Sequence, residues 1–227
     1  MTLIRAILLD FDGVIKESAD IKTDAFRDLF INDYDSSLVE EFVMYHKKNE
    51  GISRHLKIEY FYREILGRNK NIDNDIKSKA SQFSKLVVDK VINSPYVDGI
   101  IEFINFYYKD MKFFIVSGTP QEELEEITKA LGIYSKFINV FGSPKTKIDI
   151  INSIICTGNY KNNEVVMFGD AMTDYMAADY NDTFFIGRVK KDNLKQVFPI
   201  NTLTITSFKQ AYELIDKLGR ESVSINI

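Results

Sequence analysis

The sequence predicts an α/β protein built on a doubly wound parallel sheet, with an all-helical segment inserted after the first strand. Short apolar runs without a polar break, typical of buried parallel strands, alternate with amphipathic stretches of helical period. Strands that alternate with helices in this way indicate a parallel sheet with helices on both faces. One long stretch after the first run holds helical patterns and no convincing strand, and it predicts the insert.

Six apolar runs predict the strands of this sheet. The first ends in two aspartates and a glycine, and three of the others lead into loops that carry polar groups. Each run is short, as buried strands are, and is followed by residues that favour turns or helix starts. In chain order the predicted strands are residues 6–11, 112–117, 137–141, 164–168, 183–186 and 203–206.

Five further helical patterns, from residue 97 onward, alternate with the remaining predicted strands or follow them. Thr119 and Pro120 are predicted to begin the second of them, as the N-cap and the first helical residue, and Gly132 to end it. The other patterns show apolar residues at the i, i+3 and i+4 spacing of a buried helix face. The predicted core helices are residues 97–108, 121–131, 148–156, 172–179 and 207–218.

The segment between the first strand and Pro95 differs from the rest of the chain. It contains four amphipathic stretches separated by Asn, Asp, Ser and Gly residues, which favour loops. We therefore expect a helical insert over residues 16–94 and a core made of residues 1–15 and 95–227. The predicted helices of the insert are residues 20–30, 36–48, 53–66 and 73–91.

Composition narrows the class of protein. The chain has 227 residues, is 45% hydrophobic and 27% charged, and carries a net charge of −4, which argues against a broad nucleic-acid-binding face. No apolar stretch approaches the ~20 residues that span a bilayer, and the N-terminus does not resemble a signal peptide. We expect a cytoplasmic protein without membrane or nucleic-acid partners, a monomer or weak dimer. The single cysteine, Cys156, lies in an apolar run and is predicted to be a buried thiol.

Two carboxylates follow the first strand. Side chains two positions apart on a strand point to the same side, so Asp10 and Asp12 can share one site at the carboxyl end of the strand. Open α/β sheets bind ligands at that end. Two like charges this close need a cation or a shared proton. The alternative is a strand followed by a solvated Asp-Gly turn.

Polar groups also follow three other predicted strands. Ser117 and Gly118 precede a helix, where a hydroxyl and free N–H groups can bind an anion or simply cap the helix. Lys145 and Lys147 lie in the loop after the third strand, where a lysine can neutralise a phosphoryl oxygen or remain solvated.

The loop after the fourth strand adds two more carboxylates. Asp170 lies at the strand end and Asp174 one helical turn later. The carboxyl ends of all these strands meet at one edge of the predicted sheet. A site of carboxylate oxygens with open positions for water and phosphate suits Mg²⁺ better than a softer metal.

In this order, DFDGVI, VSGT, a loop lysine and GDAMTD resemble the four motifs of the haloacid dehalogenase-like superfamily of phosphatases and mutases. The resemblance extends from residue 1 to about residue 190. It implies a Rossmann-like core and a mobile cap, and a helical insert after the first motif is the family's C1 type of cap.

The resemblance also implies roles for the carboxylates. Asp10 would be the nucleophile that forms an aspartyl-phosphate, and Asp12 the general acid and then the general base. Mg²⁺ would be held by Asp10, the backbone carbonyl of Asp12, Asp170 and Asp174.

The remaining motifs would hold the transferring phosphoryl group. Ser117, the N–H of Gly118 and one lysine are the groups that the resemblance assigns to its oxygens. Lys147 is the preferred lysine because it directly precedes a helical pattern, with Lys145 as the alternative.

Asp12 indicates the reaction. Dehalogenases of this superfamily lack an acid at its position and phosphonatases have a small residue there, so an aspartate favours cleavage of a phosphate ester. We expect a Mg²⁺-dependent phosphatase acting on a small phosphorylated metabolite, such as a sugar or polyol phosphate. The alternatives are a phosphosugar mutase and a binding module on a degenerate fold.

The predicted cap offers one clue to the substrate. Residues 50–54, EGISR, resemble the cap loop of β-phosphoglucomutases, so Arg54 and Lys57 are candidates for contact with an anionic or sugar substrate. The alternative is an N-cap at Ser53 with solvated charges. Lys22 stands where the mutases have a histidine, and this departure weighs against mutase activity.

Overall fold

The computed structural model describes residues 4–49, 51–190 and 197–221. Its centre is a six-stranded sheet in the order β3-β2-β1-β4-β5-β6, in which every pair of neighbours is parallel. This confirms the predicted Rossmann-like doubly wound core. The strands are β1 (Ala6–Leu9), β2 (Lys112–Pro120), β3 (Asn139–Ser143), β4 (Val165–Gly169), β5 (Phe184–Arg188) and β6 (Leu203–Ile205).

Alternate residues of each central strand enter two separate apolar clusters. On β1, Ile7 and Leu9 pack on the side of α5 (Ile100–Tyr107), α6 (Gln121–Ala130) and α9 (Ala211–Glu221). Leu8 packs on the opposite side, against α7 (Lys147–Gly158) and α8 (Met172–Tyr180). The period of two along the strand thus produces a three-layer core.

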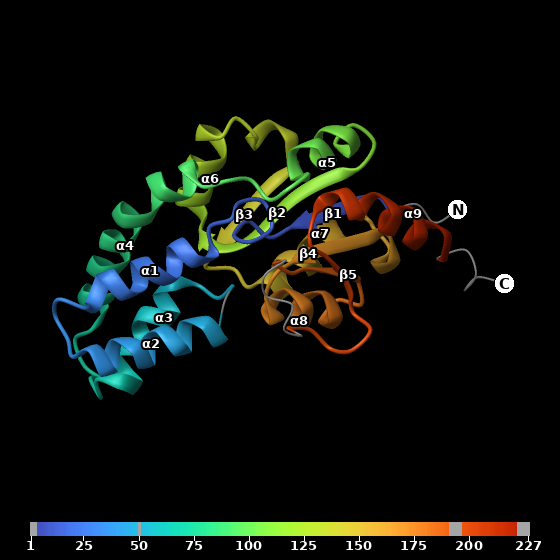
Figure 1. The fold of residues 1–227 in the computed structure, drawn as a ribbon. Coiled ribbons are helices and arrows are strands. Elements are labelled where there is room, and N and C mark those ends of the chain that lie inside the picture. Colours follow the sequence, from blue (N-terminus) through green and yellow to red (C-terminus); the bar gives the residue numbers. More distant parts are fainter. Residues whose placement is uncertain (1–3, 50, 191–196, 222–227) are drawn as a thin grey trace.

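Four helices between β1 and α5 form a separate layer at the carboxyl edge of the sheet, far from the two termini (Figure 1). We call them the helical unit. Its centre is aromatic and includes Phe26, Phe30, Phe42, Phe61 and Phe83, all fully or almost fully buried. Residues 61–65 continue the third helix as a π-helical turn. The helices are α1 (Ala19–Phe30), α2 (Ser36–Lys48), α3 (Arg54–Tyr60) and α4 (Asp73–Asn93).

Two sequence predictions are wrong in detail. Thr119 and Pro120 do not form the predicted helix start, because β2 continues through Pro120 and α6 begins at Gln121. Thr119 instead faces the polar edge of the sheet, where its hydroxyl contacts Asp12 and Lys22. Cys156 is exposed and not buried, because α7 turns its Ile150, Ile151 and Ile154 face toward the sheet and Cys156 outward.

Other helix and strand boundaries differ from the predicted ranges by a few residues. The predicted helix over 97–108 begins only at Ile100, after Gly99 with a φ of 79°. The predicted helix over 207–218 opens with a 3₁₀ turn, Phe208–Gln210. Within the described ranges, no helix combines the length and apolar character that a membrane crossing requires.

Candidate active site

Asp10 lies directly after the central strand β1 and is almost fully buried. Its Oδ1 accepts a hydrogen bond of 2.7 Å from the backbone N–H of Phe11. Its backbone N–H in turn donates to the carbonyl oxygen of Phe168 on β4, at 3.0 Å. These contacts fix the carboxylate at the carboxyl end of the sheet, where parallel α/β sheets place their ligands.

Lys147 joins two of the predicted carboxylates. Thr146 caps α7 by accepting the N–H of Asp149, so Lys147 is the first residue of that helix. Its Nζ donates to Oδ2 of Asp10 at 2.8 Å and also to Oδ1 of Asp174. Burial alone would lower the pKa of Lys147, but the two carboxylates outweigh it and the pKa lies above its ordinary value. Lys145 is exposed, so the structure brings Lys147 and not Lys145 to Asp10.

Asp174 is completely buried. It lies in the first turn of α8, where its Oδ2 accepts the N–H of Ala171 at 3.2 Å. Burial, followed by the Asp10 charge, raises the pKa of Asp174 against the opposing effect of Lys147. A carboxylate kept in such a place needs a positive partner.

Asp10, Asp170 and Asp174 form a cluster in which one carboxylate oxygen of each lies within 4.8 Å of the others. Asp170 reaches this place beside Gly13, whose φ is +75° and whose missing Cβ leaves the room that the Asp170 carboxylate occupies. The donors are all oxygens, which is the donor set that Mg²⁺ prefers. The residues present therefore fit a divalent, oxygen-bound metal.

Asp12 belongs to a second group of contacts. Ser18 donates to its Oδ1 at 2.6 Å, and Lys22 and Thr119 both donate to its Oδ2. Lys22 also donates to the Thr119 hydroxyl at 2.7 Å. Burial acts to raise the pKa of Asp12, but the Lys22 charge and the three donors outweigh it and leave the pKa below its ordinary value.

The loop at the start of α3 contacts the core beside Ser117. Ser117 is buried, and its Oγ accepts the N–H of Thr119 at 3.2 Å. A Cβ on Gly118 would overlap the carbonyl oxygen of Gly51 and lie 3.2 Å from that of Ile52. The two backbones therefore meet directly, and the helical unit is closed against the sheet edge.

A cavity of about 60 Å³ lies between the helical unit and the core. Its core wall holds the predicted catalytic groups, and its other wall holds three cations of the helical unit. The core groups are Asp10, Asp12, Asp170, Ser117 and Gly118, and the cations are Lys22, Arg54 and Lys57. The structure thus brings these predicted residues to one cavity; Lys147 and Asp174 do not line it, but Lys147 donates to both Asp10 and Asp174.

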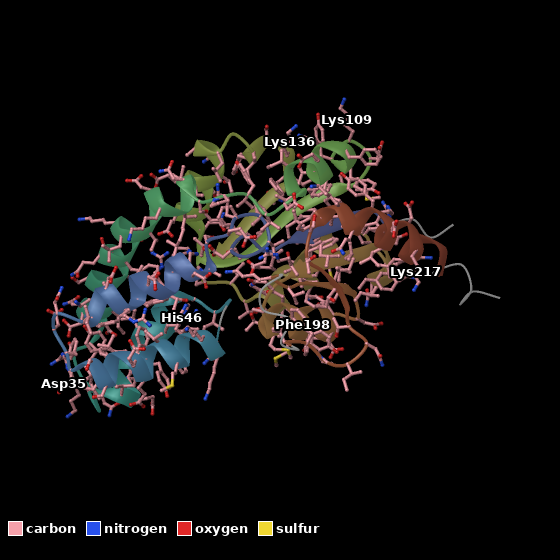
Figure 2. The ribbon with its side chains drawn as sticks, viewed as in Figure 1. Asp35, His46, Lys109, Lys136, Phe198 and Lys217 are labelled. Atoms are coloured by element: carbon pink, nitrogen blue, oxygen red, sulfur yellow. The ribbon has the colours of Figure 1, made fainter. Side chains whose placement is uncertain are left out.

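The two predicted substrate contacts in the helical unit are both held by other residues. Arg54 forms a buried ion pair with Glu123 of α6. Lys57 contacts Nδ1 of His46 at 2.9 Å, and Nε2 of His46 lies 3.1 Å from the Thr23 hydroxyl. Figure 2 shows His46 among the helices of the helical unit. Ser53 does cap α3, accepting the N–H of His55 at 3.3 Å.

Sequence reasoning missed three groups of this site. Ser18 and Thr119 bind the Asp12 carboxylate, and Glu123 binds Arg54. Ser18 and Glu123 had no signal of their own, because a serine before a helix and a glutamate in its first turn are typical of ordinary helix starts. The order VSGT-Pro offered a signal for Thr119, since the residue before a proline is usually extended.

The model of a hydrolase family, described as haloacid dehalogenase-like hydrolase, matches residues 4–180. The chain belongs to the haloacid dehalogenase-like hydrolases. The match covers the core motifs and the whole helical unit, as the sequence resemblance predicted. A search of the curated proteins gave no match.

Solved structures of other members share the fold of this haloacid dehalogenase-like hydrolase. A β-phosphoglucomutase from Clostridium difficile is 21% identical, with a TM-score of 0.74 over 98% of this chain and 100% of its own. A predicted phosphoglycolate phosphatase from Haemophilus somnus is 13% identical, with a TM-score of 0.72 over 94% and 98%. CbbY from Rhodobacter sphaeroides, in complex with xylulose-(1,5)bisphosphate, is 17% identical, with a TM-score of 0.71 over 91% and 95%. At these low identities, the comparisons show a shared fold and not a shared substrate.

Proposed function

We propose that this hydrolase is a Mg²⁺-dependent phosphatase that removes phosphate from a small phosphorylated metabolite, through an aspartyl-phosphate on Asp10. One observation carries the proposal: Asp10 and Asp12 line the same cavity but have separate sets of partners. Asp10 contacts a lysine and lies in a carboxylate cluster, whereas Asp12 has three side-chain donors of its own. Two carboxylates in different surroundings suit different chemical roles.

In the first half of the reaction, an Asp10 carboxylate oxygen bonds to phosphorus while the bond from phosphorus to the leaving alcohol oxygen breaks. Asp12 gives that oxygen a proton, so the product leaves as a neutral alcohol. Ser117, the N–H of Gly118 and Lys147 hold the phosphoryl oxygens, whose charge must be stabilised as they move.

In the second half, water attacks the phosphorus of the aspartyl-phosphate and the bond to Asp10 breaks. Asp12 accepts the proton of the water and returns to its starting state after phosphate leaves. The carboxylate form that this base step needs is the form that Lys22, Ser18 and Thr119 stabilise. In the first half, by contrast, the Asp12 carboxylate must take a proton from solvent before it can give one to the leaving oxygen, and the proton it accepts from water in the second half returns to solvent.

The residues that would hold Mg²⁺ are Asp10, Asp170, Asp174 and the backbone carbonyl of Asp12. When bound, Mg²⁺ would neutralise negative charge on the phosphoryl oxygens and on the carboxylates around them. Lys147 supports this arrangement, since it already offsets part of the charge of Asp10 and Asp174.

Residues 16–94 act, in this proposal, as a mobile cap whose opening admits the substrate and whose closing excludes water. The direct approach of Gly51 to Gly118 and the small size of the cavity support the view that this structure is the closed form. Arg54 and Lys57 line the cavity, so we place the leaving group, a sugar or polyol, against them.

A phosphosugar mutase of the β-phosphoglucomutase type is the second candidate, because the loop Gly51–Arg54 closes on the cavity next to Ser117 and Gly118. Such an enzyme transfers phosphate from Asp10 to a substrate hydroxyl and not to water. Lys22, which contacts Asp12, gives no support for this role. An isomerisation assay with a sugar phosphate and a trace of the matching bisphosphate separates the two reactions.

Phosphate release from a panel of phosphorylated metabolites, with and without Mg²⁺, tests the proposal. We expect rapid release from one class of compound, dependent on the metal and absent in Asp10→Asn. Asp149→Asn is the matched control, because Asp149 is an aspartate of α7 whose partner is Thr146. Full activity of Asp10→Asn would show that the proposal is wrong.

A further inference from the structure

Glu123 and Arg54 connect the two sides of the cavity. Glu123 lies in the first turn of α6, in the core, and Arg54 is the first residue of α3, in the helical unit. Arg54 Nη1 donates to Oε2 of Glu123 at 2.8 Å, and Nη2 donates to Oε1. The pair is therefore bidentate, the geometry in which a guanidinium binds a carboxylate most specifically.

The surroundings of this pair hold both side chains in place. Both residues are at least nine-tenths buried. Ser84 of α4 donates to Oε2 of Glu123 at 2.6 Å and accepts a hydrogen bond from Nη1 of Arg54. The guanidinium also lies over the ring of Phe83, 4.6 Å from its centroid. Because Arg54 donates to both Glu123 and Ser84 and stacks on a ring, its guanidinium has few N–H donors left for a ligand.

The pair changes the charge that a substrate meets. Arg54 lines the cavity, but its positive charge is compensated by a buried carboxylate supplied by the core. A second phosphate or carboxylate on the substrate could bind this guanidinium only by displacing Glu123 or by lying close to it. Either event leaves two negative groups near each other in a poorly solvated place, which is strongly unfavourable.

We infer that Glu123 is a specificity-determining residue, which occupies the guanidinium of Arg54 and so selects substrates whose leaving group carries no second anionic group. This inference rests on the proposed function and narrows its substrate class to phosphate monoesters of uncharged, hydroxyl-bearing alcohols. The leaving group lies against Arg54 and the ring of Phe83 without needing a charge of its own.

The test compares the affinity of the protein for a sugar monophosphate with its affinity for the corresponding bisphosphate. Dissociation constants of fructose 6-phosphate and fructose 1,6-bisphosphate are measured by calorimetry with Mg²⁺, in an Asp10→Asn background that prevents turnover. In that background the bisphosphate should bind no more tightly than the monophosphate. Glu123→Gln keeps the shape but removes the charge, so the preference should shift toward the bisphosphate by about tenfold or more.

Two further variants identify the source of the shift. Glu122→Gln makes the same charge change one residue away on the exposed side of α6 and should leave the preference unaltered. Adding Arg54→Met to Glu123→Gln should abolish the gain, because the guanidinium that receives the second phosphate is then gone.

The inference is contradicted if Glu123→Gln changes both affinities equally or gains no bisphosphate binding. It is also contradicted, without any change at position 123, if Asp10→Asn alone binds the bisphosphate more tightly than the monophosphate. Phosphate release is measured separately. A shifted preference in a protein that releases no phosphate would support the role of Glu123 while overturning the proposed function.

Discussion

Nζ of Lys147 lies 2.8 Å from Oδ2 of Asp10, although 137 positions separate the two residues in the chain. The contact joins the first residue of α7 to the residue that directly follows β1, at the carboxyl end of the sheet. It favours Lys147, which the sequence preferred over Lys145, as the lysine of the third motif. It also places a buried positive charge where, in the proposed reaction, negative charge accumulates during phosphoryl transfer.

Lys147→Met should therefore lower the rate of phosphate release about 10²- to 10³-fold, as the loss of one preorganised charge does in other enzymes. Lys145→Met is the matched control, because Lys145 is an exposed lysine of the same loop. Its activity should stay close to that of the wild-type protein. Steady-state kinetics on both variants provide the measurement, and equal losses in the two would contradict the assignment of Lys147.

Removal of metal should abolish activity, because Asp10, Asp170 and Asp174 bring carboxylate oxygens within 4.8 Å of one another, an arrangement that a divalent cation stabilises. Treatment with a chelator followed by added Mg²⁺ should restore phosphate release, and Ca²⁺ should inhibit it. Asp174→Asn should require a higher Mg²⁺ concentration for half-maximal activity. Undiminished activity after exhaustive chelation would show that the cluster is not a metal site.

Gly118→Ala should hinder closure of the helical unit, because the added methyl group overlaps the carbonyl oxygen of Gly51. We expect kcat/KM to fall about tenfold or more, with a change of less than about 2 kcal/mol in the free energy of unfolding. Gly132→Ala is the control, and it should show the opposite pattern of effects. Its φ of +69° makes the substitution strained, but beyond its two chain neighbours no heavy atom of a described residue lies within 4 Å of the new Cβ. That variant should lose stability and keep its kcat/KM.

His46 should make the protein less stable in mild acid. Lys57 donates to its Nδ1, so Nε2 carries the proton and donates to Thr23. Burial, followed by the charge of Lys57, lowers the pKa of His46 from 6.5 to about 2. Below pH 6.5, His46 therefore binds a second imidazole proton in the unfolded chain but not in the folded protein. The free energy of unfolding consequently decreases by about 1.4 kcal/mol for each unit by which the pH is lowered.

Chemical denaturation of the wild type and His46→Gln at several pH values measures the contribution of His46 to the free energy of unfolding. Glutamine can still accept from Lys57 but does not titrate, so the stability advantage of the wild type should shrink as the pH falls from about 6.5 to about 5. His55→Gln, at the exposed histidine of α3, is the control and should change the slope less. A wild-type advantage that grows in acid would contradict the predicted sign.

The core could be predicted from the sequence because its signals are local. Runs such as Ile7–Leu9 cannot be exposed without large cost, and carboxylates directly after them must lie at the sheet edge. The places of Asp10 and Asp170 follow from their positions at strand ends, and that of Asp174 from its position one helical turn later. The structure adds that the three carboxylates converge within 4.8 Å.

The contacts between the helical unit and the core could not be predicted in the same way. Whether Arg54 faces solvent, substrate or Glu123 depends on how four helices dock on the sheet, and helical period does not determine docking. Thr119 shows a related limit, since Thr-Pro before a helical pattern also fits a helix start. Cys156 shows a third, because an apolar run on a helix still has one outward face.

The most direct test of the central claim is to find the phosphate on Asp10. The wild-type protein is mixed with Mg²⁺ and the best compound of the panel, quenched within one turnover, digested and examined by mass spectrometry. We predict one added phosphoryl group on the peptide that contains Asp10 in the wild-type protein, and none in Asp10→Asn. Phosphate release that proceeds with the phosphoryl group on another residue, or with none on the protein, would contradict the account.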